Sequence, residues 1–345
     1  MDYKSAGVDI DAGNESVRRI RALARSTFTS GVLSEIGSFG GLFQLETGRF
    51  REPVLVASAD GVGTKLKVAF LLGRHETVGV DLVNHCVNDI LVQGAEPLFV
   101  LDYLATGRLS PQVAESVVGG IASACRDNGC ALLGGETAEM PGFYGDGEYD
   151  LAGFIVGVAD RERLISGRTI ATGDVLVGVP SSGLHTNGFS LARRIVFERL
   201  GLTVDTHIAE FGRTLGEELM EPHRSYLPLV RPLLDGGRIK GMAHITGGGI
   251  TENLPRVLPH GTAAVVDTAA WEIPPVFRWL QRNGHVPIAD MMRTFNMGLG
   301  LIIVTPRDKA EPLMEELAAR GGRDARVVGE VVAGEPPSVS YVNLS

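Results

Sequence analysis

Cysteine and positive charge are both scarce in this sequence of 345 residues. Cys86, Cys125 and Cys130 are an odd number with no CxxC spacing, so we expect reduced core residues rather than disulfides or a zinc site. Lysine and arginine total 32 against 41 aspartates and glutamates, a net charge of −9. No basic stripe is present to meet nucleic-acid phosphates, so we expect no nucleic-acid partner.

Long apolar segments are also missing. No stretch approaches the roughly 18 residues that a membrane span needs, and the first residues, Met1–Ser5, show no signal-peptide pattern. We therefore expect no membrane partner and a cytoplasmic location. Glycine, by contrast, is abundant at 45 residues, in a chain that is 44% hydrophobic and can bury a sizeable core.

Chain length favours two domains over one. The stretch 161–172 is polar and lacks apolar periodicity, so we expect a boundary there, with domains at 1–165 and 166–345. Both halves mix strand and helix patterns, which predicts an α/β or α+β architecture. The run 150–158 is nearly all apolar, which is typical of a strand buried on both faces.

The expected elements follow from apolar periodicity. In the first half we expect helices near 15–24, 64–73, 81–94 and 111–128, and strands near 54–59, 98–104, 130–133 and 151–158. In the second half we expect strands near 175–179, 262–267 and 299–304, helices near 190–200, 275–283 and 308–320, and a last short strand.

The most informative segment follows the apolar run 54–57 and reads Asp60-Gly61-Val62-Gly63-Thr64-Lys65. A carboxylate, open glycine amides and a lysine leaving a strand together are the groups that bind a phosphate ester with Mg²⁺. The spacing is neither the GxxxxGK[ST] phosphate loop nor the dinucleotide GxGxxG. From the pattern alone, a phosphate site and a tight Asp-Gly turn with a surface lysine are equally good interpretations.

Further acidic segments favour the phosphate site. Asp81, His85, Asn88 and Asp89 share one face of a predicted helix, a pattern that alone would indicate a solvated surface. Gly134-Gly135-Glu136-Thr137-Ala138-Glu139 follows the apolar run 131–133, and its glycine pair lets the backbone approach a ligand closely. Converging carboxylates repel one another unless cations lie between them, so the three segments together indicate a divalent cation.

The second half carries polar glycine motifs of its own. Ser181-Ser182-Gly183-Leu184-His185-Thr186-Asn187-Gly188 opens a predicted helix, which fits an anion site and ordinary helix capping about equally well. Thr246-Gly247-Gly248-Gly249 places three entropically costly glycines between apolar segments, which favours close approach to a ligand. His85, His185 and His244 lie near these motifs, although a single histidine is more often structural than catalytic.

Together these motifs resemble the signatures of the phosphoribosylformylglycinamidine cyclo-ligase family, also called aminoimidazole ribonucleotide synthetases. The matching segments are Tyr3–Asn14, Asp60–Lys65, Val87–Asp89, Gln93–Pro97, Gly134–Pro141, Ser181–Gly188, Thr246–Gly249 and Arg293–Asn296. They occur in the family's order across nearly the whole chain, which makes the resemblance highly specific.

The resemblance implies a two-domain α/β (α+β) fold, in which the N-terminal sheet completes a barrel across a homodimer and a C-terminal α/β domain contributes the ribonucleotide site. It also implies a reaction of purine biosynthesis. ATP and formylglycinamidine ribonucleotide, the small-molecule partner, give aminoimidazole ribonucleotide, ADP and phosphate, with ATP and Mg²⁺ as the implied cofactors.

The resemblance also implies roles for individual residues. Asp60, Lys65, Asp89 and His185 are the candidate catalytic residues, and Asp60, Asp89 and Glu136 are the candidate Mg²⁺ ligands, supported by Asp81 and Asn88. The implied nucleotide contacts are Gly40, Gly41, Asp60, Gly61, Gly63, Thr64, Lys65, Asn88, Asp89, Gly135, Glu136 and Thr137. The implied ribonucleotide contacts are Ser182, His185, Thr186, Asn187, Gly247 and Gly248, and either His185 or His244 would move a proton.

The sequence departs from the family's pattern at one place and leaves sister enzymes to consider. Some members of the family have consecutive lysines near the first helix, where this chain has Arg25-Ser26. Selenophosphate synthetase and the hydrogenase-maturation dehydratase share the ATP half-site, but each needs a cysteine, in the N-terminal loop or at the C-terminus, that is missing here. Thiamine-phosphate kinase, an ATP-sensing module and a glycine-rich structural protein also stay open. The acids that accompany Lys65 argue against the sensing module, and three acidic, glycine-marked segments are hard to explain as turns alone.

Overall fold

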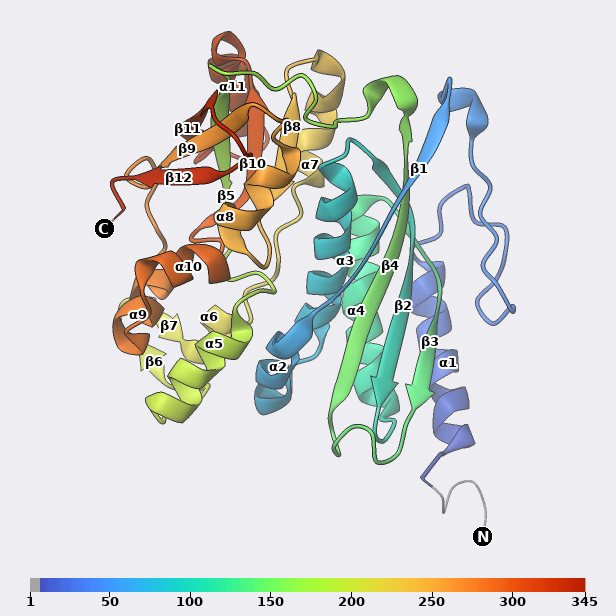
Figure 1. Ribbon diagram of the computed structural model, residues 1–345. Helices are drawn as coiled ribbons and strands as arrows, with labels where there is room; N and C mark the ends of the chain where they lie inside the picture. Colours follow the sequence, from blue (N-terminus) through green and yellow to red (C-terminus); the bar gives the residue numbers. More distant parts are fainter. Residues whose placement is uncertain (1–6, 345) are drawn as a thin grey trace. The chain divides into compact units, whose positions relative to one another are not determined.

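The computed structural model describes residues 7–344, so the family motif expected from Tyr3 lies partly outside the described residues. The chain forms two compact units. Unit 1 holds the residues up to Ile90 together with Ala95–Glu162, and unit 2 holds Leu91–Gly94 together with the residues from Arg163 onward. Both units combine sheets and helices (Figure 1), which confirms the predicted α/β (α+β) class. None of the described helices is long and apolar enough to cross a bilayer.

Unit 1 is built on a four-stranded sheet in the order β1-β4-β2-β3. Its strands are β1 (Pro53–Gly61), β2 (Glu96–Thr106), β3 (Ala131–Glu139) and β4 (Tyr149–Asp160), and only the β2–β3 pair is parallel. Its helices are α1 (Ile10–Arg25), α2 (Leu66–Leu72), α3 (Glu76–Leu91) and α4 (Pro111–Asn128). Local sequence sets the helix ends, since the Ser110 side chain caps the start of α4 and Gly129, with φ of 68°, ends it.

Helices α3 and α4 lie against one face of this sheet (Figure 1). Glycines on the strands let the helices approach closely, because a Cβ at Gly153 would lie 2.9 Å from the Leu82 side chain and one at Gly157 would lie 2.5 Å from Ile90. The opposite face keeps apolar side chains exposed, with Leu55 63% and Phe154 46% accessible. The prediction that the 150–158 strand is buried on both faces is therefore wrong for the single chain.

Unit 2 is built on a six-stranded sheet in the order β12-β9-β11-β5-β10-β8. These strands are β5 (Val175–Pro180), β8 (Gly241–His244), β9 (Thr262–Asp267), β10 (Leu299–Thr305), β11 (Arg326–Ala333) and β12 (Val339–Val342), and a small ladder joins β6 (His207–Ile208) to β7 (Arg213–Thr214). The helices are α5 (Phe189–Arg193), α6 (Leu215–Leu219), α7 (Leu227–Val230), α8 (Gly249–Asn253), α9 (Pro275–Gly284), α10 (Ile288–Thr294) and α11 (Ala310–Ala319).

Several predicted boundaries differ from the structure. Helix α3 begins at Glu76, earlier than expected, and strand β3 continues to Glu139, so the segment 134–139 is part of a strand rather than the loop after it. Asp60 and Gly61 likewise lie within β1, where they pair with Gly153 and Ala152. Sheet pairing explains both extensions, because polar residues and glycines continue a strand when a neighbour offers hydrogen bonds.

Candidate active site

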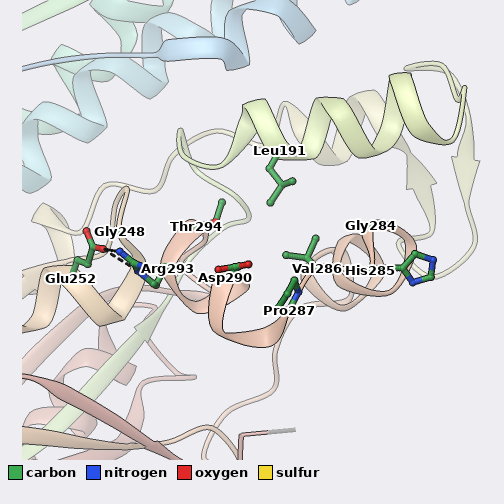
Figure 2. A pocket seen from close by; sticks show the side chains of 10 residues that line it. All are labelled: Leu191, Gly248, Glu252, Gly284, His285, Val286, Pro287, Asp290, Arg293 and Thr294. Carbon is green, nitrogen blue, oxygen red and sulfur yellow. Dashed lines mark hydrogen bonds and ion pairs between the residues drawn. The ribbon is translucent and has the colours of Figure 1, made fainter.

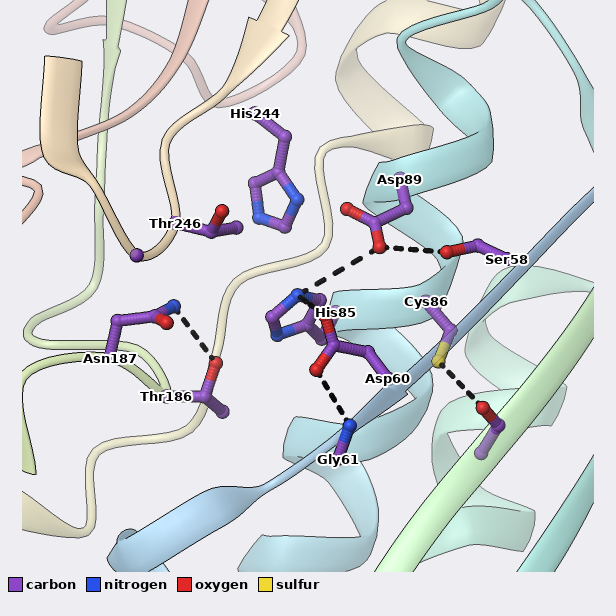
Figure 3. Close-up of polar contacts among 12 residues, drawn as sticks. Ser58, Asp60, Gly61, His85, Cys86, Asp89, Thr186, Asn187, His244 and Thr246 are labelled. Carbon is purple, nitrogen blue, oxygen red and sulfur yellow. Dashed lines mark hydrogen bonds and ion pairs between the residues drawn. The ribbon is translucent and has the colours of Figure 1, made fainter. Parts of the chain in front are cut away.

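The acidic site of unit 1 centres on His85, a buried residue of α3. Asp60 Oδ2 lies 2.9 Å from His85 Nε2, and Asp89 Oδ2 lies 3.9 Å from the same nitrogen (Figure 3). Ser58 donates a hydrogen bond of 3.0 Å to Asp89 Oδ2. The helical spacing of His85 and Asp89, and the position of Asp60 at the end of β1, therefore bring the two predicted carboxylates to one point.

The charge balance of this cluster shows in the pKa of His85. Burial lowers that pKa, but the contact with Asp60 and the negative charges of Asp89, Asp60 and Asp81 outweigh burial and raise it above its usual value. The two carboxylates therefore favour a cation at the point where their oxygens approach His85. Carboxylate oxygens are the ligands that Mg²⁺ prefers, so Asp60 and Asp89 fit the metal that the resemblance implies.

Glu136 does not join this cluster within unit 1. It lies on β3, and the strand order places β4 and β2 between β3 and β1. At the strand spacing of about 4.8 Å, the backbones of β1 and β3 are about 14 Å apart. Glu136 is exposed and borders a different cavity, so the single chain brings together two of the three predicted metal ligands.

Lys65 is not the surface lysine that a simple turn would have. Its side chain and that of Asp81 are both fully buried, and Nζ lies 2.8 Å from Asp81 Oδ2 and 2.9 Å from Oδ1. The short turn Gly63–Lys65 leads directly into α2, which carries Lys65 inward while Gly63 and Thr64 stay exposed. Asn88 is also fully buried. The predicted contact of Lys65 with phosphate stays a prediction.

A cavity of about 290 Å³ lies along β3, where the predicted contacts Gly135, Glu136 and Thr137 line it. Its other walls come from α1, α4 and Ile36, which are mostly apolar, and from Asp102 of β2. The segment that leads to Gly40 and Gly41 starts beside the cavity, where Ile36 lines it, and a Cβ at Gly41 would lie 2.5 Å from the Leu133 side chain of β3. A concave, largely apolar cavity with a few polar groups is the usual form of a small-molecule site.

The histidine site of unit 2 gathers three imidazoles. His185 stacks on His223 with ring centroids 3.9 Å apart, and His223 Nε2 lies 3.0 Å from His244 Nε2. At this distance a ring N–H of one imidazole can donate to the bare nitrogen of the other, and the tautomers decide which of the two is the donor. Thr186 Oγ1 is 3.4 Å from His223 Nδ1, and the Ser182 backbone N–H donates to His185 Nε2 at 3.2 Å.

His185 also has an unusual backbone, with φ of 61°, a region that residues other than glycine seldom adopt. The surrounding contacts therefore hold this loop in a strained conformation, as is common at ligand sites. Sequence reasoning identified His185, Thr186, Asn187 and His244 but missed His223, which carries no glycine or acidic motif beside it. Asn187 donates to Thr186 Oγ1 at 3.4 Å (Figure 3).

The second glycine motif of unit 2 borders a cavity of about 600 Å³. Gly248 contributes to its wall together with Glu252, Asp290, Arg293 and Thr294 (Figure 2). Glycine is required in this loop, because Gly248 and Gly249 have φ of 98° and 60° and a Cβ at Gly249 would lie 2.0 Å from the Met292 carbonyl oxygen. Arg293 is held by Glu252, with Nη2 2.5 Å from Oε1.

Comparison with known proteins gives the class first. Residues 48–159 match the N-terminal domain of the AIR synthase related proteins, and residues 171–342 match their C-terminal domain. Two solved structures share the fold. Thiamine-monophosphate kinase from Stenotrophomonas maltophilia K279a aligns with a TM-score of 0.68 and 19% identity, over 94% of this chain and 96% of that one. Hydrogenase maturation protein HypE in complex with ATP aligns with a TM-score of 0.66 and 18% identity, over 95% of this chain and 92% of that one. The protein is thus of the AIR synthase related class.

Full-length relatives make the assignment more specific. The phosphoribosylformylglycinamidine cyclo-ligase of Syntrophotalea carbinolica is 52% identical over 340 residues, which cover 97% of each chain. The chain belongs to the phosphoribosylformylglycinamidine cyclo-ligase family. The predicted family is therefore confirmed, and the cyclo-ligase is favoured over the sister enzymes, with which the similarity is one of fold.

Proposed function

We propose that this chain closes the imidazole ring of aminoimidazole ribonucleotide from formylglycinamidine ribonucleotide, in a reaction of purine biosynthesis that converts ATP to ADP and phosphate. The observation that carries the proposal is the full-length relationship to a curated cyclo-ligase. The acidic site of unit 1 and the histidine and glycine sites of unit 2 support it, because the reaction needs both a phosphoryl donor site and a ribonucleotide site.

The chemistry explains why ATP is needed. An amide oxygen is a poor leaving group, so the formyl oxygen first takes the terminal phosphoryl group of ATP, and ADP leaves. The amidine nitrogen then attacks the formyl carbon, phosphate departs with that oxygen, and the nitrogen loses a proton. Because nitrogen and carbon belong to one bound molecule, closure is intramolecular and strongly favoured.

We assign the nucleotide to unit 1. Asp60 and Asp89 would hold Mg²⁺, which neutralises phosphate charge when bound, and the backbone of the Gly40–Gly41 loop would cover the phosphates with N–H donors. The apolar cavity along β3 is suited to the base of ATP. A protein of similar fold, hydrogenase maturation protein HypE, has been solved in complex with ATP, which supports an ATP site in this architecture.

We assign the ribonucleotide to unit 2, at Ser182, His185, Thr186 and Asn187 with Gly247 and Gly248. His223 Nε2 and His244 Nε2 lie 3.0 Å apart, and a hydrogen-bonded pair of imidazoles can accept the proton that the amidine nitrogen loses. Arg293 lies at the wall of the neighbouring cavity, where a cation would suit a ribonucleotide phosphate.

Replacing His185 with alanine is expected to raise the KM for the ribonucleotide about tenfold or more while leaving the KM for ATP nearly unchanged, as the loss of one buried polar contact predicts. Steady-state kinetics with each substrate varied in turn gives both values. His207→Ala is the matched control, because His207 is exposed on β6. An equal rise of the KM for both substrates would show that this loop is not specific to the ribonucleotide site.

We also propose that the chain is a homodimer joined through the open face of the unit 1 sheet, as the barrel implied by the resemblance requires. Phe154 pairs with Ala59 on one side and Leu101 on the other, and Leu55 extends the exposed apolar surface along β1. A continuous apolar strand surface of this kind favours association with another chain.

Phe154→Asp is expected to convert the dimer largely to monomer, because a carboxylate at the centre of the interface would lose its hydration without a partner. Sedimentation velocity at micromolar concentration measures the change. Leu71→Asp serves as the control, since Leu71 is 60% exposed on α2 rather than on the sheet. A wild-type protein that sediments as a monomer would contradict the proposal, as would a Phe154→Asp variant that stays dimeric.

The test of the whole proposal is ADP release by the purified protein with Mg·ATP, with and without formylglycinamidine ribonucleotide. We expect ADP only when the ribonucleotide is present, with one ADP formed for each imidazole product. Tight ATP binding without turnover of this substrate would instead point to a sister enzyme and to another amide or phosphoryl acceptor.

A further inference from the structure

The cavity along β3 contains one acid that the reaction described above does not use. Asp102, on β2, is only 8% exposed and lines the cavity among apolar side chains such as Val17, Ile20, Val118 and Leu132. No other described residue forms a hydrogen bond or ion pair with its carboxyl group. A buried carboxyl that no neighbour satisfies is costly to keep, so its presence in a cavity indicates a ligand that it contacts.

The sheet makes space for this acid. Asp102 pairs with Gly135 on β3 and with Gly153 on β4, so glycines flank it in both neighbouring strands. A Cβ at Gly135 would lie 2.1 Å from Asp102 Oδ1, so any other residue there would displace the carboxyl. Gly135 therefore has a specific reason to be glycine: it accommodates the Asp102 side chain at the cavity wall.

The environment of the carboxyl keeps its neutral form accessible. Burial raises the pKa of Asp102 to about 7, its own backbone N–H lowers it, and the charge of Glu136 raises it. The hydrogen bond with Cys130 and burial raise the pKa of the Cys125 thiol of α4, as does the charge of Asp102, and the α1 residues that line the cavity carry no charge. A neutral carboxyl has both an O–H donor and a C=O acceptor, and an ionised one still accepts from an N–H.

We propose that Asp102 recognises the hydrogen-bonding edge of the base of the bound nucleotide. Its carboxyl oxygen accepts from the exocyclic 6-amino group of adenine, and in the neutral form its O–H donates to ring nitrogen N1. The apolar side chains of α1, α4 and β3 enclose the faces of the ring. This proposal rests on the proposed ATP site and adds to it the residue that forms hydrogen bonds with the adenine base.

A double-mutant cycle between protein and ligand tests the contact. Binding of Mg·ATP and of the Mg complex of purine riboside triphosphate, which lacks the 6-amino group, is measured by calorimetry for the full-length wild type, Asp102→Asn and Asp102→Leu. The wild type is expected to bind ATP about tenfold more tightly than the analogue, the typical effect of one buried hydrogen bond. Asp102→Asn, whose amide oxygen still accepts, is expected to keep this preference, whereas Asp102→Leu is expected to lose it.

The outcomes separate this inference from the proposed function. If Asp102→Leu still prefers ATP over the analogue as strongly as the wild type, Asp102 does not contact the amino group and the inference is wrong while the ATP site stands. A wild type that binds neither triphosphate overturns both. Asp102→Asn differs from the wild type by one atom type, so it keeps the test valid even where the leucine variant folds poorly, since loss of the preference in a folded Asp102→Asn would also overturn the contact.

Discussion

Asp60→Asn is expected to reduce turnover by about 10³-fold or more and to weaken Mg·ATP binding, while the fold stays intact. The asparagine keeps an oxygen that His85 can contact but loses the charge that a metal ion and its phosphates require. Asp60 is 44% exposed in its side chain, and Asp89 stays beside His85 as a second negative charge, so a thermal melt is expected to move by only a few degrees.

The companion variant Asp89→Asn is expected to behave in the same way, because both carboxylates approach the same nitrogen of His85. Asp127→Asn is the matched control, since Asp127 is an exposed acid near the end of α4. Initial rates at several Mg²⁺ concentrations show whether excess metal partly restores activity, as expected when a ligand is weakened. Near-normal activity of both Asp60→Asn and Asp89→Asn would remove these residues from the metal site.

Sequence patterns brought Asp60 and Asp89 together as candidates, and the structure places both beside His85. His85 and Asp89 are one helical turn apart, and Asp60 lies at the end of an apolar strand, both of which are local patterns. The strands and long helices of unit 1 were predicted for the same reason. In unit 2, the short elements β8, α8 and α10 were missed, because four to seven residues with glycine neighbours do not establish a period. The longer strand β11 was missed as well, where Gly329 interrupts the apolar run.

The residues that sequence reasoning missed depend on pairing between distant segments. Asp102 becomes a candidate only once the strand register places it between Gly135 and Gly153. His223 becomes one only because a loop brings it to His185 and His244. Glu136 shows the reverse case, since its motif resembles the other acidic segments but the strand order separates it from Asp60 in the single chain. Neither register nor strand order can be read from one sequence without an alignment.

Lys65→Met is expected to lower the free energy of unfolding by about 3–5 kcal/mol, because it leaves Asp81 as a buried charge without its main counterion. Both side chains are fully buried and their charged atoms lie 2.8 Å apart. Denaturant titration followed by far-UV circular dichroism measures the loss. Lys67→Met, on the partly exposed neighbour that pairs with Glu148, is the matched control and is expected to change stability by less than about 1 kcal/mol.

The double variant Lys65→Met with Asp81→Leu distinguishes a structural lysine from one that also binds phosphate. Removing both charges replaces an ion pair by apolar side chains of similar size, so much of the lost stability is expected to return. If Lys65 contacts phosphate, the refolded double variant still binds Mg·ATP weakly and turns over slowly, because the cation is gone. If stability and activity return together, the lysine serves only to neutralise Asp81, and the phosphate must then be held by Mg²⁺ and backbone N–H groups of the glycine segments.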